Sequence, residues 1–164
     1  MISIPLTSLK EVGIRTILCD LDNTLTPAHN PHPVAMSFDF VKNCQENGFD
    51  FYIISNNHPK RVKLVADELQ VKYHPETKKP FGKRLLKFLN KEGIAKDNCI
   101  LIGDQILTDV IYANRLGLKS ILIEPCSSKD LPITYINRKL DRLIRKRLKK
   151  KGLLREIERG ESYE

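Results

Sequence analysis

The stretch IRTILCDLDNTLTP, residues 14–27, decides the fold class. It begins as a short apolar, β-rich run (residues 14–19) and changes at Asp20 to acids and turn-forming residues. Such a run is typical of a strand buried on both faces, as in a parallel sheet. Asp20 and Asp22 are therefore expected at or just beyond the carboxyl end of a buried strand.

Similar apolar runs recur at residues 49–54, 99–102 and 120–123, with a weaker candidate at 71–74. The stretches between them (34–45, 61–69, 81–89 and 106–116) place apolar residues three and four apart, as amphipathic helices do. This alternation predicts a single Rossmann-like, three-layer α/β domain with a mostly parallel central sheet. In such sheets ligands bind outside the carboxyl ends of the strands.

The composition is that of one folded domain. The chain has 164 residues, of which 41% are apolar and 29% charged, which excludes a disordered or fibrous protein. No apolar run approaches the roughly 20 residues of a membrane-spanning helix, and charges near the N-terminus exclude a secretory signal. Four cysteines lie far apart without a CxxC pair (Cys19, Cys44, Cys99 and Cys126), which predicts reduced thiols and a cytoplasmic location.

The first strand ending brings two acids together. Asp20 and Asp22 are one residue apart, and both carboxylates can reach the space above the sheet if the chain turns there. Paired carboxylates suit a hard cation such as Mg²⁺ and also a nucleophile working with a general acid. The alternative is that Asp22-Asn23-Thr24 only caps a turn.

Polar residues also follow the other strands. Ser55 and Asn56 offer a hydroxyl and an amide to phosphate oxygens, although the same pair is an ordinary start of a helix. Lys79 lies in a polar segment, where it could balance clustered charges or be solvated at the surface. Asp104, after Gly103, is a third oxygen ligand, whereas Asp109 is expected no nearer than the surroundings of the site.

In order and spacing these segments resemble the haloacid dehalogenase-like (HAD) superfamily of phosphohydrolases. CDLDNTLTP (19–27) and GDQILTD (103–109) are similar to its subclass IIIA. DLDNTL, IISNN, KKPFGK, IGDQILTDV and NRLG resemble the small bacterial branch related to phosphatidylglycerophosphate phosphatase. The resemblance extends over residues 6–152 and implies the HAD-like fold.

The resemblance implies a role for each acid. Asp20 would be the nucleophile that forms an aspartyl-phosphate, and Asp22 would protonate the leaving oxygen and later activate water. Mg²⁺ would be held by the Asp20 carboxylate, the Asp22 backbone carbonyl and the Asp104 carboxylate. These ligands match the oxygen preference of this cation.

The resemblance also implies a phosphate-binding set. Ser55 and Lys79 would bind the transferring phosphoryl oxygens, with Asn56 assisting. Lys79 is preferred to Lys78 because the family motif places its lysine directly before the proline. Thr24 matches the motif position that steadies the loop.

Two short connections predict that the domain carries no cap. Residues 26–33, and the stretch before Lys79, are too short to hold one. An open site favours a large or surface-bound substrate. His29 and His32 lie in the first connection, where solvent exposure is the expected state, although contact with substrate is an alternative.

The net charge of +8 is local. Residues 138–151, RKLDRLIRKRLKKK, hold nine basic residues and one acid, so the rest of the chain is balanced. We expect a basic helix near residues 133–151 within a domain over 1–152, and a short charged tail at 153–164. One apolar stripe is expected on this helix: Ile136, Leu140, Leu143, Ile144 and Leu148.

Three interpretations of the basic helix compete: a solvated surface helix, a nucleic-acid footprint, and attachment to an anionic membrane surface. The segment lacks interleaved aromatics, so no nucleic acid is expected, and the lipid-phosphatase resemblance favours the membrane. The predicted location is cytoplasmic, with peripheral contact at the inner face of the membrane. No obligate protein partner is predicted.

The leading hypothesis is a Mg²⁺-dependent phosphomonoesterase that acts on phosphatidylglycerophosphate. One alternative is a HAD phosphatase of a soluble sugar or nucleotide phosphate. Another, of a different class, is a non-catalytic phosphate-responsive binding module, such as a receiver domain. The DxDxT sequence argues against the last, because its second acid is suited to leaving-group chemistry.

Overall fold

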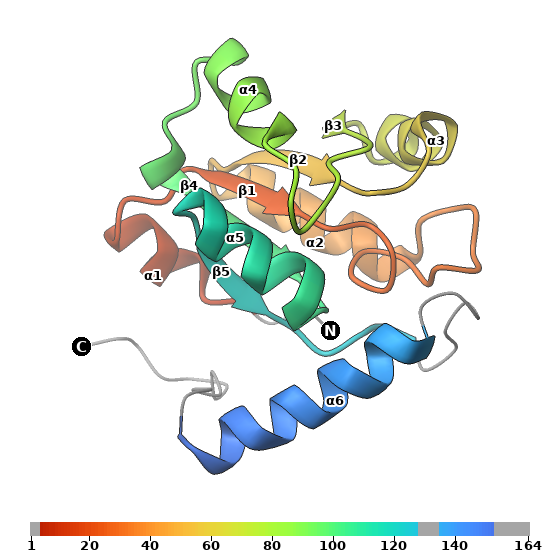
Figure 1. Ribbon diagram of the computed structural model, residues 1–164. Coiled ribbons are helices and arrows are strands. Elements are labelled where there is room, and N and C mark those ends of the chain that lie inside the picture. Colours follow the sequence, from red (N-terminus) through yellow and green to blue (C-terminus); the bar gives the residue numbers. More distant parts are fainter. Residues whose placement is uncertain (1–3, 128–134, 153–164) are drawn as a thin grey trace.

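The computed structural model describes residues 4–127 and 135–152 (Figure 1). Its sheet has five strands: β1 (Thr16–Cys19), β2 (Asp50–Ile54), β3 (Lys72–His74), β4 (Cys99–Gly103) and β5 (Lys119–Leu122). All pairings are parallel, in the order β3-β2-β1-β4-β5. The predicted α/β class and parallel sheet are therefore confirmed, and β1 lies at the centre.

Helices cover both faces of this sheet. Helices α1 (Leu6–Glu11), α2 (Ala35–Glu46) and α3 (Pro59–Leu69) pack on one face, against strand residues such as Ile17 and Ile53. Helices α4 (Arg84–Lys91) and α5 (Ile111–Leu116) pack on the other, against Leu18 and Ile54. Successive strand residues thus point into opposite cores, which explains why the strands are apolar throughout.

Three short elements depart from the predicted pattern. Helix α1 and a 3₁₀ turn, η1 (Lys96–Asn98), were not expected from the sequence. The helix expected at 106–116 is divided into a π-helical turn, η2 (Ile106–Val110), and α5. π-helical turns are rare and frequently lie at functional sites. This one carries Asp109.

The connections at the carboxyl edge of the sheet contain no inserted domain within the described residues. Residues 20–34 join β1 to α2, and residues 75–83 join β3 to α4. In both segments the backbone forms only turns and a single isolated bridge between Asp22 and Thr26. The prediction of an uncapped domain is confirmed for the described part of the chain.

The basic helix is present as α6 (Tyr135–Lys150), which lies beside β5 and outside the three layers (Figure 1). Only part of the expected apolar stripe is turned inward. Leu140 and Leu143 are 47% and 52% exposed, whereas the inward face carries the buried Asp141 with half-buried Ile144 and Leu148. Polar contacts of Asp141, described below, set the face that α6 turns inward.

Some predictions concern residues beyond those described. The side chain of Ile136 and the expected tail at 153–164 lie outside the described residues. No helix in the described ranges combines the length and the apolar character needed to cross a membrane.

Candidate active site

Three strand endings meet at one edge of the sheet. Asp20 follows β1, Ser55 follows β2 and Asp104 follows β4. Because β1 pairs with both β2 and β4 in parallel, their carboxyl ends are neighbours. The structure thus brings together the candidate residues that the sequence placed on separate segments.

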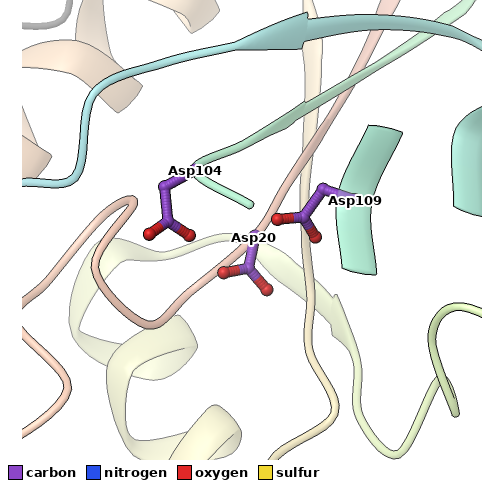
Figure 2. A group of neighbouring side chains, drawn as sticks. All are labelled: Asp20, Asp104 and Asp109. Carbon is purple, nitrogen blue, oxygen red and sulfur yellow. The ribbon is translucent and has the colours of Figure 1, made fainter. Parts of the chain in front are cut away.

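The centre of the site is a group of three buried carboxylates, Asp20, Asp104 and Asp109 (Figure 2). One oxygen from each lies within 4.8 Å of the others, and the residues are 8%, 0% and 1% exposed. Carboxylates buried so close together repel one another unless positive charge lies among them. The all-oxygen donor set fits Mg²⁺, which prefers hard oxygen ligands.

Asp109 lies closer to the centre than the sequence analysis expected. Its approach depends on Gly103, because a Cβ at that position would meet Cγ of Asp109 at 2.3 Å. Asp109 also accepts a hydrogen bond from the backbone N–H of Gln105 (3.1 Å). The glycine before Asp104 is therefore the sequence signal for this close packing.

Lys79 supplies positive charge within the described site. Its Nζ donates to Oδ1 of Asp20 at 2.5 Å and to Oδ1 of Asp109 at 2.7 Å. Burial alone would lower the pKa of Lys79, but the Asp109 and Asp20 carboxylates outweigh it and raise this pKa above its ordinary value. Lys79 therefore stays protonated beside the expected nucleophile, while Lys78 makes no such contact in the described structure.

Asp20 is strongly perturbed by its surroundings. Burial raises the pKa of its carboxyl well above the ordinary value; Lys79 lowers it, and the nearby Asp109 and Asp104 raise it again. A divalent cation among these oxygens favours the ionised carboxylate. The site is therefore electrostatically suited to a cation that keeps Asp20 ionised and nucleophilic.

Asn56 holds the loop that carries Lys79. Its Oδ1 accepts from the backbone N–H of Lys79 (2.7 Å) and from the hydroxyl of Thr77 (2.9 Å). Its Nδ2 donates to the carbonyl of Lys79 (2.9 Å). These contacts favour a positioning role for Asn56, and its direct assistance in phosphate binding stays a prediction.

Ser55 and Thr24 lie beside the carboxylates. Ser55 is buried, and its Oγ accepts from the N–H of Asn57 (3.0 Å), which leaves the hydroxyl proton to turn toward a ligand. Thr24 donates to Oδ1 of Asp104 (3.3 Å). Thr24 therefore steadies an expected metal ligand as well as its own loop.

Asp22 lies at the rim, with its side chain 26% exposed. Its Oδ1 accepts from Nε (3.1 Å) and Nη2 (2.8 Å) of Arg61, and its Oδ2 accepts from Nδ2 of Asn57 (2.9 Å). Arg61 also donates to the carbonyl of Asn30 (2.8 Å). The sequence analysis missed Arg61; only its place at the start of the helix after the second strand could have suggested it.

The two histidines of the first connection lie at the surface. His29 and His32 are exposed, as expected, and Nδ1 of His32 lies 2.6 Å from a carboxylate oxygen of Glu68 on α3. The described contacts of His32 are therefore with Glu68 and the loop, not with the acidic centre.

Comparison with known proteins identifies the family. The model of the family described as "Mitochondrial PGP phosphatase" matches residues 1–126. The chain belongs to this family. A relative, the "Probable phosphatase YqeG" of Bacillus subtilis, is 38% identical over 144 residues, which cover 88% of this chain and 84% of YqeG. The "Phosphatidylglycerophosphate phosphatase 1, chloroplastic/mitochondrial" of Arabidopsis thaliana is 28% identical; the match covers 88% of this chain and 44% of that protein.

Solved structures support the fold. A predicted HAD-like family hydrolase from Porphyromonas gingivalis has a TM-score of 0.57 at 14% identity, covering 81% of this chain and 98% of that one. The HAD-hydrolase YfnB of Bacillus subtilis, solved with bound magnesium, has a TM-score of 0.56 at 14% identity, covering 73% and 90%. The HAD resemblance is confirmed, and the protein is a HAD-type phosphatase, a phosphoric monoester hydrolase.

Proposed function

We propose that this protein is a Mg²⁺-dependent phosphomonoesterase that works through an aspartyl-phosphate on Asp20 and acts on phosphatidylglycerophosphate. The observation that carries the reaction type is the buried group Asp20, Asp104 and Asp109 with Lys79 between two of its members. This group can hold a cation beside a nucleophile and counter the charge of a phosphoryl group. Phosphoryl transfer is catalysed mainly by such positioning and neutralisation.

The proposed reaction has two displacements. An oxygen of Asp20 attacks phosphorus in line, the bond to the ester oxygen breaks, and the protonated Asp22 gives its proton to that leaving oxygen. Asp22 then takes a proton from water, whose oxygen attacks phosphorus and breaks the bond to Asp20. Phosphate and the alcohol are released, and both carboxyl groups return to their starting states.

Three groups would hold the metal: the carboxylates of Asp20 and Asp104 and the backbone carbonyl of Asp22. When bound, Mg²⁺ supplies positive charge that stabilises the oxygens of the transferring phosphoryl group. Lys79 and Ser55 would also bind oxygens of the phosphoryl group. Asp109 keeps Lys79 in place, since its Oδ1 accepts from the Lys79 ammonium.

Two observations support a lipid as substrate. The Arabidopsis thaliana relative carries the name of a phosphatidylglycerophosphate phosphatase. The described part of the chain leaves the carboxyl edge of the sheet without a cap, so a phosphate on a large or surface-bound molecule can approach it.

The outward face of α6 supports contact with an anionic membrane surface. Six basic residues are exposed on α6: Lys139, Arg142, Lys146, Arg147, Lys149 and Lys150. The exposed Leu140 and Leu143 add apolar area among these charges. A helix of this kind binds at the lipid interface, where each basic residue contributes about 1 kcal/mol.

Phosphate release in anionic mixed micelles tests the substrate. We expect the wild type to release phosphate from phosphatidylglycerophosphate only with Mg²⁺, and faster than from sugar phosphates, nucleotides or p-nitrophenyl phosphate. Activity on a soluble metabolite with none on the lipid would overturn the substrate but keep the reaction. No activity on any ester would favour the binding module instead.

Vesicle sedimentation tests the membrane surface separately. We expect binding to vesicles that contain phosphatidylglycerol but not to pure phosphatidylcholine, and a loss of about tenfold or more in a Lys146→Glu/Lys150→Glu double variant. The matched control is Lys87→Glu/Lys91→Glu, which changes net charge equally at exposed positions of α4. Equal losses in both variants would show a net-charge effect and no specific role for α6.

A further inference from the structure

Side chains of α6 hold the loop that carries Asp104. Nη2 of Arg145 donates to the backbone carbonyl of Asp104 at 2.5 Å. Oδ1 of Asp141 accepts from the backbone N–H groups of Ile106 (2.6 Å) and Leu107 (3.3 Å), at the start of η2. The backbone from the carbonyl of Asp104 to the N–H of Leu107 is therefore held by α6, which is far away in sequence.

Arg145 also joins the ends of two strands. The same Nη2 donates to the carbonyl of Ile123, just after β5, at 3.0 Å, and Asp104 follows β4 directly. Nε donates to Oδ2 of Asp141 (3.1 Å) and Nη1 to a carboxylate oxygen of Glu124 (3.1 Å). The planar guanidinium thus serves four acceptors in one fixed geometry, which a lysine ammonium cannot reproduce.

The orientation of α6 indicates that these contacts decide its placement. The side chains of Asp141 and Arg145 are only 4% and 14% exposed, whereas Leu140 and Leu143 on the same helix face solvent. Burying a charged pair costs desolvation, so it is a poor way to attach a helix unless its hydrogen bonds do something specific. Here those bonds end on the backbone of the Asp104 loop.

We propose that Asp141 and Arg145 are positioning residues that set the place of the Asp104 carboxylate for a bound divalent cation. Arg145 holds the backbone carbonyl of Asp104, and Thr24 donates to its Oδ1. A ligand held at both its backbone and its side chain loses little freedom when a cation binds. This inference rests on the proposed metal dependence.

Metal affinity, measured without substrate, tests the inference. Mn²⁺ and Mg²⁺ are titrated calorimetrically into wild type, Arg145→Ala, Asp141→Asn and the control Arg142→Ala, an exposed position of the same helix. We expect a Kd about 10- to 100-fold weaker for Arg145→Ala. Asp141→Asn keeps the acceptor for both N–H groups and loses the ion pair, so we expect a smaller loss, and no change in Arg142→Ala.

The melting temperature of each variant separates positioning from general stability. A lower melting temperature of Arg145→Ala with an unchanged Kd at a temperature where it is folded would overturn the inference. If Arg145→Ala does not fold, Asp141→Asn and Arg145→Lys decide, and wild-type affinity in both would overturn it. Absence of metal binding in the wild type would instead overturn the metal-dependent function itself, and the inference with it.

Discussion

Asp20 and Asp22 are two positions apart but occupy opposite environments. Asp20 is buried with two further carboxylates and the ammonium of Lys79. Asp22 lies at the rim, where Arg61 and Asn57 hold a carboxylate that is partly open to water. A group that must attack phosphorus and bind a cation is thus separated from one that must exchange protons with a leaving group and with water.

The turn between the two acids creates this separation. Leu21 is fully buried, and its carbonyl accepts from the N–H groups of Leu25 (3.0 Å) and Thr26 (3.2 Å). The chain is therefore anchored at Leu21 and bends sharply after it. The buried Leu21 and the turn that begins at its carbonyl thus help to give the two acids different surroundings.

Replacement of the buried acid has the largest expected effect. Asp20→Asn removes the nucleophile but keeps the size of the side chain, so we expect phosphatase activity to fall by about 10⁴-fold or more with a cooperative unfolding transition retained. Turnover with p-nitrophenyl phosphate and unfolding followed by circular dichroism measure both. Activity within tenfold of the wild type would refute the assignment of Asp20.

Replacement of Asp22, the acid at the rim, is expected to reduce activity to different extents on two kinds of ester. Asp22→Asn removes the proton donor, so we expect a loss of about 10²- to 10⁴-fold on an alkyl phosphate. Nitrophenolate leaves without a proton, so its release from p-nitrophenyl phosphate in the first turnover falls much less, whereas hydrolysis of the aspartyl-phosphate slows for both esters. Equal losses on both esters in the first turnover would mean that Asp22 does not act as the acid.

The gain in stability on Mg²⁺ binding distinguishes Asp104 from Asp22. At a Mg²⁺ concentration of 100 times its Kd, we expect the wild type to gain about 2.7 kcal/mol, or a melting temperature higher by about 5 to 10 °C. Asp104→Asn should lose this gain, whereas Asp22→Asn should keep it because the ligand proposed at Asp22 is its backbone carbonyl. Scanning calorimetry with Mg²⁺ and with a chelator measures the difference; loss of the gain in Asp22→Asn would contradict the division of roles.

The part of the site built from strand endings could be predicted from the sequence, and the part built from packing could not. A parallel sheet brings the carboxyl ends of its strands together, so the apolar runs and the residues after them were enough for Asp20, Ser55 and Asp104. Lys79 came from its place before a proline in the family motif. Its contact with Asp109 follows from the missing side chain at Gly103.

Contacts between distant segments left no local signal. Periodicity placed Leu140 and Leu143 on one stripe of the basic helix, but it did not show that Asp141 and Arg145 would face the domain while both leucines are exposed. The spacing of apolar residues predicts which side chains share one face of a helix. It does not predict which groups a charged side chain will contact. The contact of Arg61 with Asp22 was missed for the same reason.

Arg61 gives the mildest test of the contrast between the acids. Its Nε and Nη2 both donate to Oδ1 of Asp22, so Arg61→Ala leaves that carboxyl held only by Asn57 among the described contacts and does not alter the buried acids. In the first turnover we expect about a tenfold loss on an alkyl phosphate and little change on p-nitrophenyl phosphate, because only the first needs a proton on its leaving group. Lys63→Ala, at an exposed position of the same helix, is the control and should behave as the wild type. An equal loss on both esters would instead mean that Arg61 binds the phosphoryl group itself. The contrast between the two acids would then be weaker, because residues beside Asp22 and residues beside Asp20 would both bind the negative charge of the substrate.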